Sequence, residues 1–143
     1  MSALHVSRRT AFGLAGAASA TVALAACSNG DGKDYSGEVK FDSFERSGNY
    51  EPATKDKPAQ NVPKPVKPSQ MNEKSAAGFY AAIGYLAAAM QYLLEDLEPE
   101  PLIEVLGDSQ GNYDQFKQMK SSNLAWVVNP KVVISLKTPQ PKV

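Results

Sequence analysis

The stretch "SAAGFYAAIGYLAAAMQYLLEDLEP" (residues 75–99) decides the fold, because it carries the strongest periodic pattern in the chain. Large apolar residues recur in it at steps of four and three, which places them on one face of an α-helix. These residues are Phe79, Ile83, Leu86, Met90, Leu93 and Leu97. Asn72 or Ser75 is suited to cap the start of this helix, and Pro99 is expected to end it.

A second stripe on the same helix is made of small and aromatic residues: Ala77, Ala81, Gly84, Ala88, Tyr85 and Tyr92. No charged residue stands between Lys74 and Glu95, so the helix lacks a solvated face and is expected to be covered on most sides. Three arrangements stay open. The Ala/Gly face lies against a sheet, or it pairs with a second copy or an envelope protein partner, or the helix spans a membrane. The tyrosines and Gln91 disfavour the membrane span, because their polar groups are costly in lipid.

Downstream, "EPEPLIEVLGD" predicts a short second helix that Gly107 ends. Its expected inward residues are Leu102, Ile103, Val105 and Leu106. Two alternating runs follow, with "NPK" between them, which predicts a hairpin. The runs are Leu124, Trp126, Val128 and then Val132, Ile134, Leu136. We therefore expect an α+β domain over residues 71–143, with one long helix and a short helix packed on a small antiparallel hairpin or sheet.

Upstream, residues 27–70 are polar and broken by glycine and proline. The run "NVPKPVKPSQ" favours stiff, polyproline-II-like backbone. We expect a disordered, proline-rich tether here, with a few scattered aromatic residues. At about 3 Å per residue, such a tether would reach on the order of 100 Å.

Residues 1–26 are typical of an export signal, with Arg8 and Arg9 before an uncharged run. The run ends in "LAAC", which resembles the lipobox of bacterial lipoproteins. That resemblance implies cleavage between Ala26 and Cys27, a diacylglyceryl group on the Cys27 sulfur, and a lipid-anchored protein on the outer face of the cell membrane. The segment "SRRTAFGL" is similar to a twin-arginine signal, so Arg8 and Arg9 leave both the general secretory and the twin-arginine routes open.

Composition excludes several kinds of function. The chain has 15 basic and 15 acidic residues, and loss of residues 1–26 would leave 13 basic against 15 acidic ones, which gives no electrostatic footprint for nucleic acid. The only histidine is His5, so the processed chain would have no Ser-His-Asp catalysis and no histidine-ligated metal. Asp108, Asn112 and Asp114 do not fit the EF-hand spacing. We expect no cofactor, no metal and no enzymatic activity.

The stretch from Asn61 to Leu106, and more weakly Trp126 to Pro141, resembles uncharacterised actinobacterial lipoproteins that carry a domain of unknown function. The shared features are a "PxPxxP" segment, a long helix rich in alanine and aromatic residues, a short second helix and a later strand with tryptophan. The resemblance implies no activity and no cofactor. The order of helix and sheet is also similar to a reduced nuclear-transport-factor-like fold, although few residues follow Met119 for its curved sheet.

The sequence therefore predicts a membrane-anchored surface lipoprotein whose domain is a non-catalytic binding or envelope-structural module. A first alternative is a small-ligand carrier that uses a helix–sheet crevice lined by Tyr80, Tyr85 or Trp126. A second alternative is a cell-wall hydrolase that uses carboxylates. Its candidate acids are Glu95, Asp96, Glu98 and Glu100.

Overall fold

The computed structural model describes residues 32–107 and 113–139. The chain divides into two units, Met1–Lys33 and Asp34–Val143, and the second unit is the one described below. Several predicted residues lie outside the described ranges, so the structure does not test them: Arg8, Arg9, Ala26, Cys27, Asp108 and Asn112.

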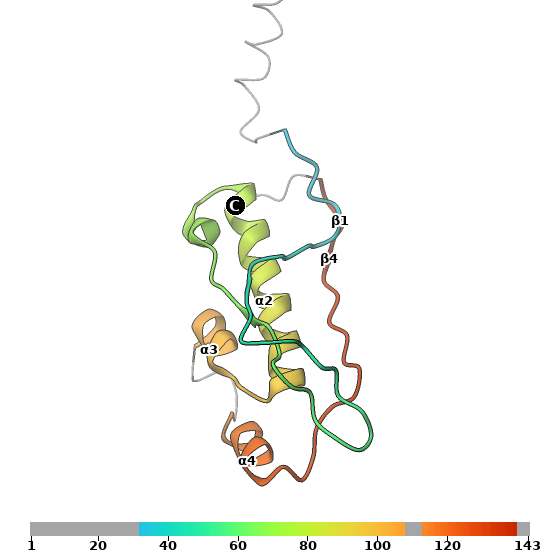
Figure 1. Cartoon of the computed structure of the whole chain (residues 1–143). Coiled ribbons are helices and arrows are strands. Elements are labelled where there is room, and N and C mark those ends of the chain that lie inside the picture. Colours follow the sequence, from blue (N-terminus) through green and yellow to red (C-terminus); the bar gives the residue numbers. More distant parts are fainter. Residues whose placement is uncertain (1–31, 108–112, 140–143) are drawn as a thin grey trace, which may run out of the picture. The chain divides into compact units, whose positions relative to one another are not determined.

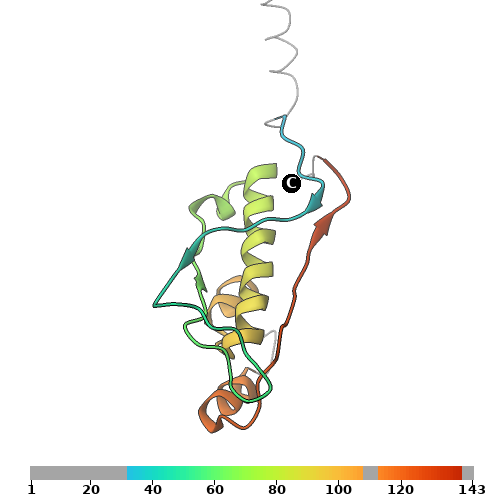
Figure 2. The same ribbon diagram turned by 45° about the vertical axis from the view of Figure 1, so that its right-hand side comes forward.

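The second unit is mixed α+β, as the sequence predicts (Figure 1). Its helical elements in the described ranges are η1 (Ser69–Asn72), α2 (Ala76–Asp96), α3 (Glu100–Leu106) and α4 (Asp114–Ser122). Its strands there are β1 (Gly37–Glu38), β2 (Phe44–Glu45), β3 (Lys64–Pro65) and β4 (Ser135–Leu136). The strands form two antiparallel pairs, β1 with β4 and β2 with β3. Figure 2 shows the two pairs on different sides of α2.

Helix α2 begins and ends where the sequence predicts. The Ser75 hydroxyl accepts a hydrogen bond from the Gly78 N–H at 3.0 Å, which satisfies one of the donors left open at a helix start. At the other end Leu97 takes a left-handed conformation with φ of 60°, and its N–H donates to the Leu93 carbonyl. Pro99 follows and cannot continue the helix, because it has no N–H to donate.

Burial along α2 follows its small residues more closely than its stripe of large apolar residues. The buried residues of α2 are Ala76, Gly78, Gly84, Tyr85, Ala88, Ala89 and Leu93. Gly84 lies under residues 39–41, so part of the Ala/Gly face is already covered within the chain. The stripe of large apolar residues is buried only toward its end, at Leu93 and Leu97, whereas Met90 remains 39% exposed.

A small core joins α2 to the two following helices. Ala89, Leu93, Leu102 and Tyr113 form its buried centre, and Leu86, Ile103 and Phe116 pack against it. Figure 1 shows α3 beside the later turns of α2. Leu106, predicted to face inward, is 42% exposed because α3 ends there and Gly107 turns the chain away.

The predicted C-terminal hairpin is wrong. Residues 124–128 form no strand, Leu124 is 84% exposed and Val128 is 45% exposed. The second run does alternate, with Val132, Ile134 and Leu136 half-buried, but β4 pairs with β1 from the start of the unit. The reason lies in α2, since Gln91 binds the backbone at Pro130 and Val132 and holds this segment on the helix.

The unit begins earlier than the sequence predicts. Residues expected to be tether belong to this unit, and five of them are buried: Tyr35, Val39, Ala53, Val62 and Pro65. The Val39 N–H donates to the Ile134 carbonyl at 2.9 Å, beside the β1–β4 pair. The unit therefore starts at Asp34 rather than at residue 71. Burial of these side chains offsets the conformational entropy that the segment loses when it is ordered.

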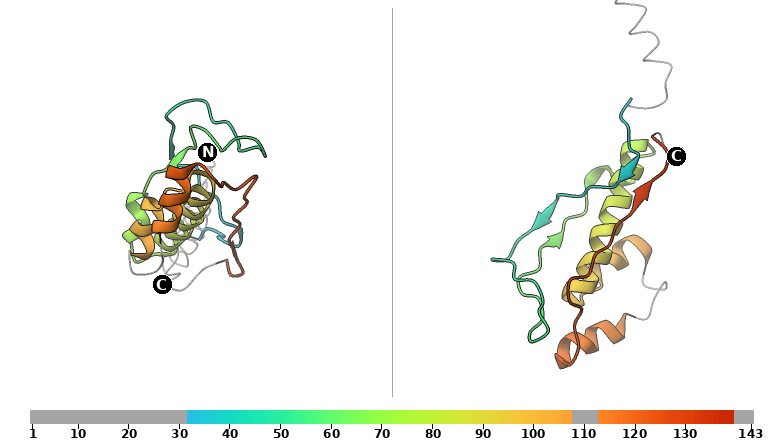
Figure 3. Two further views of the ribbon diagram at one scale, coloured as in Figure 1. Left: turned by 90° about the horizontal axis from the view of Figure 1, so that it is seen from below. Right: turned by 90° about the vertical axis from the view of Figure 1, so that its right-hand side faces the viewer.

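Two further differences from the sequence prediction concern helix α4 and the strands. The "DSQGNYDQ" segment leads into a third helix, α4, that the turn chemistry did not predict. In the described residues the strands make two short pairs, with no curved sheet of the nuclear-transport-factor kind. Figure 3 shows how extended segments, rather than a sheet, lie along α2.

Candidate functional site

A cleft opens between α2 and the β2–β3 pair, with a volume of about 220 Å³. Because Glu95 lies in it, we call it the Glu95 cleft. Its lining residues are Phe44, Arg46, Tyr50, Val62, Pro63, Ala88, Gln91, Tyr92 and Glu95. The β2–β3 side supplies aromatic and aliphatic walls, and α2 supplies most of the hydrogen-bonding groups.

Two phenols of this cleft are kept protonated. Burial, with Glu95 as a second cause, raises the pKa of the Tyr50 hydroxyl. Burial, with the nearby Asp96, raises the pKa of Tyr92 well above its ordinary value. Both hydroxyls are therefore donors at neutral pH, and the carboxylates are acceptors.

Gln91 links the cleft to the C-terminal segment. Its Nε2 donates to the Pro130 carbonyl at 2.7 Å and to the Glu95 carboxylate, and its Oε1 accepts from the Val132 N–H at 2.8 Å. One side chain thus uses its amide nitrogen and its amide oxygen to hold the cleft wall and residues 130–132 together.

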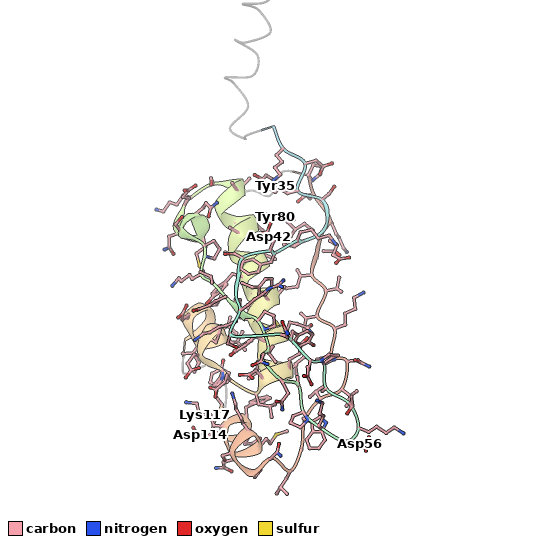
Figure 4. The ribbon with its side chains drawn as sticks, in the orientation of Figure 1. Tyr35, Asp42, Asp56, Tyr80, Asp114 and Lys117 are labelled. Carbon is pink, nitrogen blue, oxygen red and sulfur yellow. The ribbon has the colours of Figure 1, made fainter. Side chains whose placement is uncertain are left out.

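A second cleft of about 200 Å³ lies at the end of α2, and we call it the Trp126 cleft. It is lined by Pro58, Ala59, Glu95, Asp96, Leu97, Met119, Lys120, Asn123, Ala125 and Trp126. The indole Nε1 of Trp126 donates to the Thr54 carbonyl at 2.7 Å. Figure 4 labels Asp56 at the tip of the loop that follows Thr54.

Lys120 neutralises two of the acids at the end of α2. Its Nζ lies 2.7 Å from Asp96 Oδ2 and 2.9 Å from Glu98 Oε1. Burial alone would raise the pKa of Glu98, but Lys120 outweighs it and holds the pKa below its ordinary value. Burial alone would lower the pKa of Lys120, and the two carboxylates raise it instead.

The three aromatic residues predicted to contact a ligand are not brought together. Tyr85 is 2% exposed, and its hydroxyl donates to Glu104 Oε2 at 2.9 Å, so it is a core residue that joins α2 to α3. Tyr80 lies near the start of α2, where its ring packs on Tyr35 with centroids 5.0 Å apart (Figure 4). Trp126 lines the second of the two clefts described above.

Of the four candidate acids, only Glu95 lines both clefts. Asp96 and Glu98 share Lys120, and Glu100 stands exposed in the first turn of α3. Asp114, from the rejected calcium pattern, is in the first turn of α4. Across the described ranges no group of three potential metal-ligating side chains forms.

Nothing in the sequence indicated the roles of Arg46 and Lys120, and Tyr50 stood out only as one of the scattered aromatic residues of the predicted tether. Arg46 and Tyr50 lie in a stretch predicted to be tether, so their meeting with α2 had no local signal. Gln91 carried such a signal, because it is the single side-chain amide of α2, in a stretch with no charged residue before Glu95, and a packed amide needs hydrogen-bond partners.

The fold and clefts thus define a small α+β unit built on one apolar helix. Residues 48–143 match a family of unknown function (DUF6318), and the chain belongs to this family. Comparison with curated proteins and with solved structures gives no significant match. In the described ranges α2 is the one helix long and apolar enough to cross a membrane by length and composition.

Proposed function

We propose that this chain is a lipoprotein anchored to the outer face of the cell membrane through a diacylglyceryl group on Cys27, and that its folded unit is a non-catalytic binding or envelope-structural module. The observation that carries this proposal is the position of the unit boundary. The folded unit starts at Asp34, so cleavage before Cys27 would leave it whole. Two acyl chains on one sulfur give stable anchoring, which a single chain does not.

A module without catalysis is supported by the chemistry of the acids. A carboxylate hydrolase needs one acid with a raised pKa as its general acid. Lys120 instead lowers the pKa of Glu98, and the same lysine pairs with Asp96. The only histidine and the only cysteine, His5 and Cys27, both precede the folded unit.

A small-ligand carrier is the second candidate, and the Glu95 cleft favours it. Arg46 lines this cleft and forms no ion pair with any described residue, so it is available to an anionic group. The cleft is smaller than the roughly 300–1,000 Å³ of ordinary ligand pockets, which limits an occupant to a few heavy atoms. Saturable thermal stabilisation by small carboxylates, lost in Arg46→Gln, would support this candidate.

The lipoprotein proposal is tested by the mass of the processed chain. The full chain is expressed in a bacterium that lipidates proteins, membranes are isolated, and the intact mass of the product is measured beside Cys27→Ala and the neighbouring control Ser28→Ala. We expect the original chain and Ser28→Ala to begin at Cys27 and to carry the diacylglyceryl mass. Cys27→Ala should lack that mass. A product that begins at another residue, or carries no lipid, contradicts the proposal.

A further inference from the structure

One face of α2 is only partly covered by the described part of the chain. Its residues follow steps of four, four, three and four, so they share one side of the helix. They are Phe79, Ile83, Ala87, Met90 and Leu94, and none of them is buried. We call this set the open face of α2. Only 33% of the apolar window of α2 is buried, far less than in the central helix of a core.

The open face is uncharged over its whole length. The charged residues nearest to it along the helix are Lys74 before it and Glu95 after it. Other sides of α2 have neighbours within the unit, namely residues 39–41 over Gly84, α3 against Tyr85, and residues 130–132 at Gln91. The open face is therefore a bounded apolar strip and not the flank of a wholly exposed helix.

The chain between Cys27 and the unit is short. Seven Cα-to-Cα steps separate Cys27 from Asp34, and these span at most about 25 Å. The first buried side chain of the unit is Tyr35, which packs on Tyr80, the residue next to Phe79. A lipid on Cys27 would thus keep the unit within about one protein diameter of the bilayer, with the chain arriving at the end of α2 where the open face begins.

We propose that the open face of α2 lies on the surface of the lipid bilayer, so that the unit is docked flat on the membrane and not held away from it. This inference rests on the lipid anchor proposed above. An apolar helix face without charges can lie roughly 5–10 Å into the boundary between headgroups and acyl chains. The anchor supplies the affinity and the open face supplies the orientation.

A second copy of the chain is a poorer occupant. A stable dimer buries about 800 Å² on each partner, and a strip of five side chains, four of them already half-buried, offers much less. A bilayer needs no such area once a covalent lipid holds the protein at its surface, because contact then costs little further translational freedom.

The test uses the lipidated full chain with one added thiol. The Cys27 sulfur is consumed by lipidation, so Met90→Cys is the only free cysteine and can be labelled with the fluorophore NBD. Val66→Cys is the matched control, since Val66 is 44% exposed against 39% for Met90. It lies beside β3, and the cleft on that side meets α2 at Ala88, Gln91 and Tyr92, none of which belongs to the open face. Both labelled proteins are reconstituted in vesicles of phosphatidylethanolamine and phosphatidylglycerol, and their thermal midpoints are compared with that of the original chain.

We expect the NBD emission at Met90→Cys to shift to the blue, to rise several-fold on reconstitution, and to be quenched by doxyl-labelled lipids. The emission at Val66→Cys should stay that of an aqueous probe. If the protein floats with the vesicles but both probes remain aqueous, the docking proposal fails and the anchor stands. If the protein does not float, the lipoprotein proposal itself fails. A blue shift that depends on protein concentration and survives without vesicles assigns the open face to a second copy and overturns the docking proposal.

Discussion

Gly78 is a position where α2 meets other backbone too closely for a side chain. A Cβ built there would lie 2.3 Å from the Glu73 carbonyl oxygen and 2.8 Å from the Gln70 carbonyl oxygen. Backbone atoms cannot rotate away as a flexible side chain can, so η1 would have to move. At Gly84 the nearest atom is the Lys40 carbonyl oxygen at 3.3 Å, which a small shift accommodates.

The first prediction compares these two glycines. Gly78→Ala should lower the free energy of unfolding by about 1–3 kcal/mol through overpacking. Gly84→Ala should change it by less than about 1 kcal/mol, because the gain in helix propensity offsets the tight contact. Urea unfolding followed by the fluorescence of the single tryptophan, Trp126, measures both. Equal losses in the two variants would contradict the close approach of η1 to α2.

Tyr85 gives a prediction about alkaline pH. Burial, with Glu104 as a second cause, holds the pKa of this phenol well above its ordinary value of about 10. The unfolded chain therefore loses this proton first, and the free energy of unfolding falls as the pH rises above about 10. At neutral pH, Tyr85→Phe should be less stable than the original chain by about 1–2 kcal/mol, because the hydrogen bond to Glu104 is lost. Between pH 9 and pH 11, its free energy of unfolding should fall by about half as much as that of the original chain. Chemical unfolding across this range measures it, and an unchanged slope would contradict the raised pKa.

At the scale of elements, the start of α2 depends on one hydroxyl. Two residues were candidates from the sequence, Asn72 and Ser75, and the structure gives the cap to Ser75. Ser75→Ala should lower the free energy of unfolding by about 1 kcal/mol, since the Gly78 N–H loses its acceptor. Asn72→Ala, in the exposed η1 turn, is the control and should change little. A larger loss for Asn72→Ala in thermal melts would show that the helix begins elsewhere.

Helix α4 is tied to the end of α2 by Lys120. Lys120→Met should cost about 1 kcal/mol of unfolding free energy at pH 7, as for a partly exposed ion pair. Because the pKa of Glu98 is lowered in the folded chain, this contribution is complete above the unfolded pKa of about 4.3 and is lost as the pH falls through the lower folded value. The difference between the variant and the original chain should therefore shrink below about pH 4.

The control for this prediction is Lys55→Met, an exposed lysine without an ion pair among the described residues. Its unfolding free energy should follow that of the original chain at every pH. A deficit in Lys120→Met that is as large at pH 3 as at pH 7 would mean that packing, and not charge, is what the substitution removes.

Local patterns in the sequence were enough for α2 and α3, but not for the short η1 turn before them. The four-and-three spacing, the Ser75 cap and Pro99 give α2 nearly to the residue, and Gly107 gives the end of α3. These signals are local, because each depends on residues within a turn or two. Helix α4 was not predicted, because its sequence, "DQFKQMKSS", is polar and short and follows strong turn residues.

The pairing of distant segments could not be predicted in the same way. Gly37–Glu38 pairs with Ser135–Leu136 almost a hundred residues away, and two-residue strands carry no alternation of their own. The Glu95 cleft also depends on contacts between distant segments, since Tyr50 from the predicted tether meets Glu95 of α2 there. The open face was missed for a related reason. A helix without a charged face is expected to be covered on most sides, and the sequence does not show which side the distant segments leave open.

At the scale of the whole molecule, the early residues are predicted to be part of the fold. A chain shortened to begin at Phe44 loses Tyr35, which is 3% exposed, and Val39, which is 8% exposed, together with the partner of β4. Burial of each side chain stabilises by roughly 1.5–3 kcal/mol, a large share of the 5–15 kcal/mol typical of a domain. We therefore expect its unfolding midpoint in urea to fall sharply, or its cooperative transition to disappear.

A chain that begins at Lys33 should unfold at the midpoint of the chain that begins at Ser28, because residues 28–32 precede the folded unit. Equal midpoints for all three chains would make residues 34–43 a tether and place the start of the unit after them.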